Sequence, residues 1–533
     1  MKRIQFISLL FVCLFVTHCV MAQTEEQTST QPAQKTAVVL IRHADFFKPG
    51  TTTNKNILKG NVKLEHKDIV IYCDSMYQYA DRNFIEAFGN VHAIQSDTLD
   101  LWGNFMSYDG NTQKAVVRRN VVMDNKQIVL TTNHLDYDAE KRIGYYFNGG
   151  TLKDSINTLI SDFGYYFMDR EMLFFKDSVK VYAPDYTLYS DTMTYHTITK
   201  IITISGPTHI YGENRTLYSE DGWYNSLTSH VELYKNNQIT YNEYNGVADS
   251  ITIDSVSGSA QLRKNIHLYD TVNKVIVGGE YGELYKNNEY AFVTQKALMT
   301  MVGGVDSLFI HGDTLTMSKD TLGNSLMKAF YNTKFFNPEL QGLCDSMTYS
   351  VADSMVYLTG NPIVWASGNQ MTATMIDMLI DSNTVKEFHL NEKAMIVNQV
   401  SIDKFNQIKG RNMTGYIDNN ELHLVYVNGN GETIYYYEEK TDMLLNRSVS
   451  SFIKIYIKEK RIKDIEFIGD IKGTLTPLFM VTEEEKTFHD FKWYIALKPL
   501  QKNDIFIHIK PTENTKTKKG LTNTISPALS PKH

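Results

Sequence analysis

The chain has 533 residues, with 53 Lys and Arg against 60 Asp and Glu and a formal net charge of −7 at pH 7. Phosphate binding needs a basic surface, so this balance argues against nucleic acid as a partner. The sequence lacks a Gly-x-Ser-x-Gly nucleophile elbow, a His-Glu-x-x-His zinc helix and a phosphate-binding glycine-rich loop. We therefore assign no catalytic residue, no metal ligand and no cofactor, and we expect a protein that is not an enzyme.

Residues 1–22 have the pattern of a secretory signal peptide. A basic start precedes an apolar run over residues 4–16, and Val20-Met21-Ala22 provides a cleavage site. Lipidation of Cys19 is the alternative, but His18 is a poor fit immediately before a lipidated cysteine. The apolar run is too short to cross a bilayer comfortably. The sequence thus predicts export to the periplasm, and it leaves open an association with the outer membrane.

After a polar, flexible lead-in over residues 23–36, a motif returns about every 29 residues. Its clearest copies are Gly60-Asn61-Val62, Gly89-Asn90-Val91, Arg119-Asn120-Val121, Gly149-Gly150-Thr151, Asp177-Ser178-Val179 and Gly206-Pro207-Thr208. A fixed period of this length is typical of a stack of similar units. Function in such a stack is expected along a surface or groove rather than in one pocket.

Each unit has a second anchor, seen in Cys73-Asp74-Ser75 and Ser190-Asp191-Thr192. Two anchors per unit predict two extended arms, with Gly-Asn and Asp-Ser at the starts and turns of strands. The recurring acids suit side-chain capping of a turn. Calcium binding is the alternative, but it needs several carboxylates in one loop, and each unit offers roughly one.

Apolar and polar residues alternate along the arms, which is the period of a β-strand. The side chains expected to point inward are Leu58, Val62, Leu64, Ile69, Ile71, Ile85, Ala87, Val91 and Ala93. Small residues such as Ala87, Gly89 and Ala93 are expected to leave room between the two faces. Lys63 and Glu65 are expected to point outward. The fold class is therefore all-β, as an elongated antiparallel β-jellyroll or solenoid.

The array is expected to cover residues 37–409, followed by a C-terminal β-region over 410–510 and a disordered tail over 511–533. Copies between Lys235 and Asn332 are degenerate, and a groove interrupted there would suit a scaffold better than a conduit. Cys73 and Cys344, which lie beyond the cleavage site, occupy the same place in distant units. We expect two buried free thiols rather than a disulfide.

Two other patterns have a functional alternative. The strand ending in Arg42-His43 is similar to the phosphorylated-histidine segment of histidine phosphatases, but that family needs an α/β fold, so an ordinary strand residue is favoured. The tryptophans, with many tyrosines, could form a sugar-binding face, but at alternating positions they favour cross-strand packing. They are Trp102, Trp223, Trp365 and Trp493.

Taken together, the repeat, the signal peptide and the strand pattern resemble the OstA-like family, which includes the LptA-like periplasmic lipopolysaccharide transport proteins. The resemblance lies in Leu58-Lys59-Gly60-Asn61-Val62, Ala87-Phe88-Gly89-Asn90-Val91, Cys73-Asp74-Ser75, Gln95-Ser96-Asp97-Thr98-Leu99, Leu135-Asp136-Tyr137 and Ser205-Gly206-Pro207-Thr208. The chain is most similar to the long, multi-repeat forms of the Bacteroidota lineage.

The resemblance implies a β-jellyroll groove that shelters the acyl chains of lipid A, within a bridge of protomers joined edge to edge between the two membranes. Lipopolysaccharide and other components of its transport, bound through exposed edge strands, are the implied partners. At about 4.8 Å per strand, the array would span roughly 60 to 120 Å. The alternative is a structural or adhesive β-solenoid that binds protein or glycan outside. An open aliphatic inner face favours lipid, and a closed core favours the scaffold.

A carbohydrate-active β-helix enzyme is a third possibility, and it needs carboxylates clustered on adjacent units. Asp74, Asp191 and Asp345 lie in distant units, which argues against it.

Overall fold

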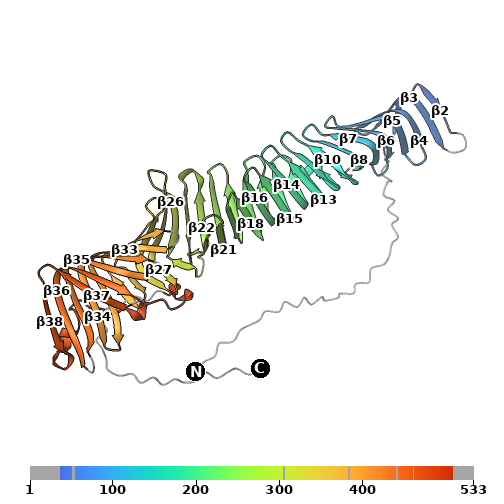
Figure 1. Cartoon of the computed structure of the whole chain (residues 1–533). Coiled ribbons are helices and arrows are strands. Elements are labelled where there is room, and N and C mark those ends of the chain that lie inside the picture. Colours follow the sequence, from blue (N-terminus) through green and yellow to red (C-terminus); the bar gives the residue numbers. More distant parts are fainter. Residues whose placement is uncertain are drawn as a thin grey trace, which may run out of the picture.

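The computed structural model describes residues 37–50, 54–303, 306–381, 384–418, 421–439, 442–459 and 461–507. The predicted signal peptide, lead-in and disordered tail lie outside these residues. The described chain forms one antiparallel sheet of 38 strands, in which strands close in sequence pair with each other to give a long twisted array (Figure 1). The prediction of an elongated all-β stack is confirmed.

The strands of the first half of the array are β1 (Leu40–His43), β2 (Phe46–Lys48), β3 (Lys55–His66), β4 (Ile69–Tyr79), β5 (Phe84–Gln95), β6 (Leu99–Asp109), β7 (Lys114–Asp124), β8 (Val129–Asp138), β9 (Ile143–Tyr146), β10 (Gly150–Lys153), β11 (Thr158–Ser161), β12 (Phe163–Phe167), β13 (Met172–Tyr182), β14 (Tyr186–His196), β15 (Ile201–Gly212), β16 (Arg215–Asn225), β17 (His230–Lys235), β18 (Asn237–Tyr241), β19 (Tyr244–Ala248) and β20 (Ser250–Asp254).

The strands of the second half are β21 (Ser259–Asp270), β22 (Val275–Tyr285), β23 (Tyr290–Thr294), β24 (Leu298–Met301), β25 (Leu308–His311), β26 (Thr314–Lys319), β27 (Ser325–Asn337), β28 (Leu340–Ser350), β29 (Met355–Thr359), β30 (Ile363–Ala366), β31 (Asn369–Thr372), β32 (Met375–Asp381), β33 (Thr384–Ser401), β34 (Lys404–Asp418), β35 (Glu421–Glu439), β36 (Asp442–Lys458), β37 (Arg461–Ile468) and β38 (Lys472–Pro477). Short 3-10 segments are η1 (Met168–Arg170), η2 (Lys286–Asn288), η3 (Leu478–Met480), η4 (Glu483–Lys486), η5 (Ile495–Leu497) and η6 (Lys502–Phe506).

Each full level of the ladder is a strand bent at its centre. In β3 the pairing with β4 shifts register between Lys59 and Val62, and the two residues in between, Gly60 and Asn61, have φ of 75° and 43°. Two residues with left-handed backbone angles on one strand, opposite a single residue on the partner strand, form a β-bulge. The bulge bends the strand without ending it. The prediction that Gly-Asn marks a strand start or turn is therefore wrong, because the pair sits inside a continuous strand.

The bend divides every level into two arms that face each other across the core. Arm A ends in the hairpin tip at Lys67–Asp68 and its equivalents, and arm B ends in the tip at 80–83 and its equivalents. The strands form roughly 28 levels about 4.8 Å apart, so the ladder is on the order of 130 Å long. The corner bulges persist through the degenerate copies, at Lys264–Asn265 and Gln295–Lys296, so the ladder is unbroken there.

A side-chain clamp joins neighbouring units at the corner. Asn61 Nδ2 donates to Asp45 Oδ2 at 2.8 Å, and Asn90 Nδ2 donates to Asp74 Oδ2 at 2.9 Å. The same bond recurs from Asn265 to Asp249, at 3.0 Å. The capping role predicted for the recurring acids is thus confirmed for Asp74, which caps the bulge of the next unit rather than a turn.

The corner glycine is required for two reasons, and Gly89 provides a test. Its φ is 72°, and a Cβ there would lie 2.4 Å from Asp74 Oδ2. We expect Gly89→Ala to destabilise its unit by more than the roughly 1–2 kcal/mol of left-handed strain alone. Gly149, with a φ of 93° and open space around its Cβ position, is the matched control. Urea denaturation with local hydrogen exchange would compare the two; equal losses would contradict a role for the clamp.

The buried apolar residues between the arms form two clusters along the array. The first runs from Val39 to Ile266 and the second from Val293 to Ile455. Cys73 and Cys344 lie in these clusters as buried free thiols, as predicted, and burial raises the pKa of each to about 12.

A third cluster lies on the outer face of arm A in the C-terminal half. There the segment 478–507, which contains η3 to η6, runs back along the array and covers Met395, Val397 and Tyr436 with Phe488 and its neighbours. Gln407 and Gln370 fix the segment through bonds to the backbone of Lys486 and Lys492, both at 2.9 Å. Residue 409, the predicted end of the array, lies within β34, and the ladder continues to β38.

Candidate functional site

The nine residues predicted to point inward all lie between the arms and are buried. Their exposed fractions range from 0% to 8%, for Leu58, Val62, Leu64, Ile69, Ile71, Ile85, Ala87, Val91 and Ala93. Lys63 and Glu65 lie on the outer face, where their side chains form an ion pair. Whether the nine contact a lipid remains a prediction.

The interior of the first units is closed. A cavity of about 20 Å³ lies between the arms, lined by apolar residues that include Ile71, Ala93 and Leu101. This is room for about one water molecule and not for an acyl chain. Ala87 is fully buried, and the space beside Gly89 is taken by Asp74. The expectation that small residues leave room between the faces is therefore wrong for this conformation.

A continuous row of side chains forms the inner edge of arm B, beside its hairpin tips. Residues paired across an antiparallel ladder share one face, so the register defines this row. We call it the lip row: Gln78, Ile85, Tyr108, Ala115, Tyr137, Gly144, Tyr166, Leu173, Tyr195, Ile202, Tyr224, Val231, Ile253, Ala260, Leu284, Ala291, Met317, Met327, Tyr349, Val356, Met378 and Phe388.

Every second member of the lip row is tyrosine over the N-terminal half. These tyrosines are Tyr108, Tyr137, Tyr166, Tyr195 and Tyr224, and none is more than 5% exposed. Burial raises the pKa of each of the five phenols, so they stay protonated at neutral pH. A buried hydroxyl needs a partner. Four of the five find that partner on the tip of the opposite arm.

The hydrogen bonds that cross from arm B to arm A come from side chains. His66 Nδ1 lies 2.7 Å from the Tyr108 hydroxyl, and the Tyr137 hydroxyl donates to Gln95 Oε1 at 2.6 Å. In the next unit, Asn125 Nδ2 donates to the Tyr166 hydroxyl. The fifth tyrosine packs edge-to-face on another ring, with Tyr186 and Tyr224 centroids 4.7 Å apart. These contacts, which we call the fastenings, join the two arms at the mouth of the groove, which is the gap between their hairpin tips.

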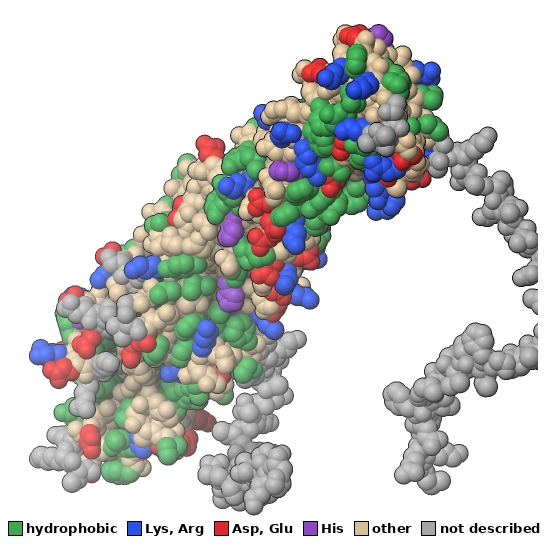
Figure 2. Space-filling model, turned by 90° about the vertical axis from the view of Figure 1, so that its right-hand side faces the viewer, with side chains coloured by type: hydrophobic (Ala, Val, Ile, Leu, Met, Phe, Trp, Pro, Cys, Tyr) green, Lys and Arg blue, Asp and Glu red, His purple; other side chains and the backbone are tan. Residues whose placement is uncertain are grey.

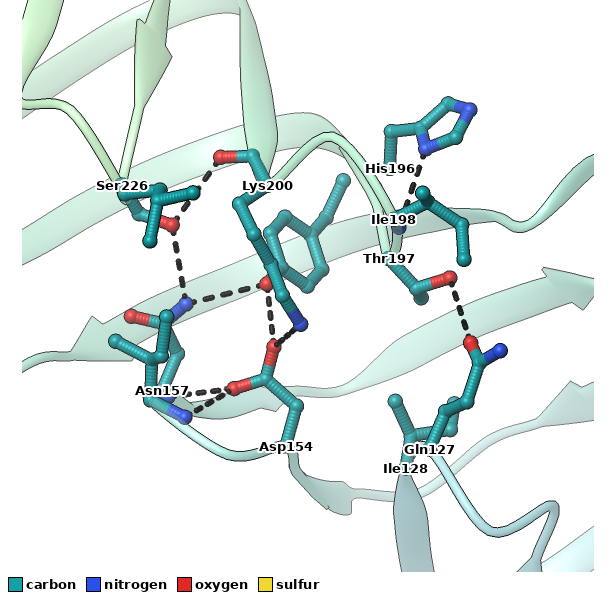
Figure 3. A network of polar contacts seen from close by, with 12 residues as sticks. Gln127, Ile128, Asp154, Asn157, His196, Thr197, Ile198, Lys200 and Ser226 are labelled. Carbon is teal, nitrogen blue, oxygen red and sulfur yellow. Dashed lines mark hydrogen bonds and ion pairs between the residues drawn. The ribbon is translucent and has the colours of Figure 1, made fainter.

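The fourth fastening is the most polar (Figure 3). Asp154, on an arm A tip with a fully buried side chain, accepts bonds from the Tyr195 hydroxyl and from Lys200 Nζ, the latter at 2.7 Å. Its other oxygen accepts the backbone N–H groups of Ile156 and Asn157. Burial opposes the ionisation of Asp154, but these donors outweigh it and lower its pKa.

The mouth changes where the tyrosines end. Ile253, Leu284 and Met317 take the next alternate places in the lip row, where Leu284 is 43% and Met317 41% exposed. Ile253 and the row members between and after them, up to Val356, are half-buried. The facing inward positions of arm A, among them Val277 and Met299, are also half-buried. The edge of the groove from Ile253 to Val356 is therefore largely apolar and partly exposed to solvent, and we call this edge the slot.

His66 gives the first fastening a predicted pH dependence. The Ala37 carbonyl accepts from His66 Nε2 at 3.0 Å, which leaves neutral Nδ1 to accept from Tyr108. Burial, the largest cause, lowers the pKa of His66. Because the unfolded chain binds the proton more readily, stability is expected to fall as pH drops below about 6.5. His66→Gln keeps both bonds without titrating, so thermal melts between pH 7.5 and 5 should show a smaller loss; equal losses would contradict this origin.

Several other sequence predictions have outcomes in the structure. His43 lies on edge strand β1 beside Asp45, in an all-β array rather than an α/β fold. Trp102 stacks on its cross-strand neighbour His92, with ring centroids 4.7 Å apart, as expected for packing. Within the described residues, no group of His, Cys, Asp or Glu is arranged to hold a metal ion. None of the described helices has the length and apolar character of a membrane span.

The tyrosine fastenings were not predicted from the sequence. Their signal was present, since five tyrosines recur in phase with the repeat. The hydrogen-bond partners of four of them lie 41 or 42 residues earlier, a separation that does not match the 29-residue repeat.

Comparison with known proteins agrees with this geometry. The model of the family described as "OstA-like protein" matches residues 35–191, which hold the strands from β1 into β14. No curated protein matches the chain. The resemblance inferred from the strand and corner motifs is confirmed for this part of the array. Residues 35–191 are thus similar to the OstA-like family.

Proposed function

We propose that this chain is a non-enzymatic periplasmic protein that binds lipopolysaccharide, sheltering acyl chains between its two arms as part of a bridge to the outer membrane. The observation that carries the proposal is the apolar interior, which follows the array from Val39 to Ile455 in two clusters. Hydrocarbon in water costs about 0.8 kcal/mol for each CH₂ group, so a carrier must offer a dry apolar path.

The closed N-terminal half can serve such a path only if its arms separate. Backbone bonds hold the strands of one arm to each other, whereas the fastenings between the lips are side-chain bonds. The neutral bonds among them, such as those of Tyr108 and Tyr137, each contribute about 0.5–1.5 kcal/mol to stability. An acyl chain that replaces contacts between apolar side chains can therefore offset the loss of one or two fastenings.

The N-terminal end of the array supports the proposed bridge. Among the described residues, strands β1 and β2 pair only with β3, which leaves their other edge available for a partner's strand. Leu40, Phe46 and Phe47 are about half exposed on these strands. Figure 2 shows hydrophobic side chains between Lys and Arg at this end of the molecule. We infer that another component of the transport machinery docks here.

The closed N-terminal interior also favours the alternative, a scaffold that binds protein or glycan on its outer face. Side chains there are packed as in an ordinary core, with Leu58, Val62 and Leu64 fully buried. The two functions differ in which face of the strands meets the ligand.

Site-specific photo-crosslinking in cells would test the proposal. Compact diazirine side chains at Leu64 and Ile71 face inward, while the neighbouring Lys63 and Tyr72 face outward on the same strands. We expect lipopolysaccharide adducts from the inward pair and none from the outward pair. Equal labelling of both faces, or capture of protein alone by the outward pair, would favour the scaffold.

A further inference from the structure

We propose that an aliphatic chain reaches the groove from the side, through the open slot between Ile253 and Val356, and that the tyrosine fastenings seal the N-terminal half against such access. The inference rests on the proposed function, because the ligand class is the same. It adds the place at which the ligand enters and the residues that decide this place.

The lip row itself is the first observation. Its alternate positions are tyrosine from Tyr108 to Tyr224, where the row is buried. They become Ile253, Leu284 and Met317 in the next units, where the row is half-buried or exposed. The strand ladder is the same on both sides of this change, so the difference lies in the side chains of the lip row.

The chemistry of the slot selects the occupant. The inward positions around it include the aliphatic or thioether side chains of Leu268, Val277, Met299 and Met327, and Tyr349 lies near its C-terminal end. Methionine adapts its shape to irregular apolar ligands. This largely apolar lining therefore suits a hydrocarbon chain.

The slot also continues into the closed interior. Ile253 and Leu268 pack against the first buried cluster, while Val277 and Met299 pack against the second. A chain that enters here lies at the junction of the two clusters. From this junction an acyl chain could extend into either apolar cluster.

Cysteine scanning provides the test, because both cysteines of the described chain are buried. The full-length variants Leu284→Cys and Met317→Cys report on the slot, and Leu173→Cys and Ile202→Cys are matched positions in the sealed part of the lip row. We expect an alkyl maleimide to react at least about tenfold faster in the slot than in the sealed part. Added lipopolysaccharide should protect the two slot positions.

A closing variant gives an independent readout. Leu284→Tyr with Met317→Tyr restores the tyrosine pattern, while Leu284→Met with Met317→Leu keeps the slot aliphatic. Diazirine side chains at Leu268 and Val277 should capture lipopolysaccharide in the wild type and in the aliphatic control, and several-fold less in the closing variant.

The failures are distinguishable. Equal maleimide rates at slot and sealed positions, or lipopolysaccharide captured at Leu64 but not at Leu268 and Val277, would overturn the lateral slot and leave the proposed function standing. Absence of lipid adducts at all inward positions would overturn both. If the tyrosine variant does not fold, the cysteine rates still decide.

Discussion

Replacing Asp154 by alanine is expected to lower the local free energy of unfolding around β10 to β16 by about 3–5 kcal/mol. The carboxylate is fully buried, and its partner Lys200 is only 16% exposed. Removing one member of a buried ion pair leaves the other charge without compensation in a poorly solvated place. Tyr195 and Asn157 lose a partner as well, and each unsatisfied buried group adds to the loss.

The array is a stack in which each level contacts its neighbours, so the effect should stay local. Hydrogen exchange is the suitable measurement, with faster exchange expected in the fourth fastening and little change in β3 to β6. Asp169→Ala is the matched control, because its pair with Arg142 is exposed and worth at most about 1 kcal/mol. An Asp154 variant that behaves like the Asp169 variant would contradict the fastening.

The same carboxylate gives a pH dependence of known sign. The pKa of Asp154 is lowered in the folded state, so its contribution is present above the ordinary carboxyl pKa of about 4. It is lost as pH falls through the lower folded value. Loosening of this fastening by acid should therefore begin below the range in which His66 acts.

The inward face was predictable because a strand has a period of two. Alternation placed Leu58, Val62 and Leu64 on one face, and one correct assignment fixes every other position of the strand. The Gly-Asn motif at the corner was recognised from the sequence, but it was wrongly predicted to lie at a strand start or turn. Gly-Asn occurs in hairpin turns because it accepts positive φ, and a bulge uses the same property inside a strand. The sequence alone does not separate the two.

Contacts between side chains on different levels of the ladder could not be predicted from the sequence. The clamp from Asn90 to Asp74 joins residues 16 apart, and the fastening from Tyr108 to His66 joins residues 42 apart. Both distances follow from strand length and register, which become known once the bend is placed at the corner. The expectation of an open inner face failed for the N-terminal half because the large tyrosines were read as strand formers rather than as the closure of the mouth.

The segment 478–507 was the hardest part to predict, because it has no period. Apolar residues such as Phe488 and Phe491 stand among polar ones without strand alternation, and among its described residues the segment has no β-strand. Its binding face exists only after arm A has formed. There, residues on the outer side of β33 and β35, including Met395 and Ile434, are buried although they point away from the interior.

Deleting everything after Pro477 is expected to destabilise the C-terminal half selectively. Phe488 and Ile505 are 6% and 0% exposed, and burying a large apolar side chain contributes about 1.5–3 kcal/mol, so the two account for roughly 3–6 kcal/mol. The deletion also removes the backbone partners of Gln370 and Gln407.

The readout is hydrogen exchange together with binding of a hydrophobic dye. Exchange should accelerate in β25 to β36 and stay unchanged in β3 to β16, because stacked levels unfold locally. A chain ending after Ile507 keeps every described contact and serves as the length control. Within the segment, Phe488→Ala should reproduce part of the loss, whereas Phe479→Ala should not, since Phe479 is 82% exposed. If both phenylalanine variants match the wild type, the segment does not stabilise arm A, and the outer apolar face must be stable without it.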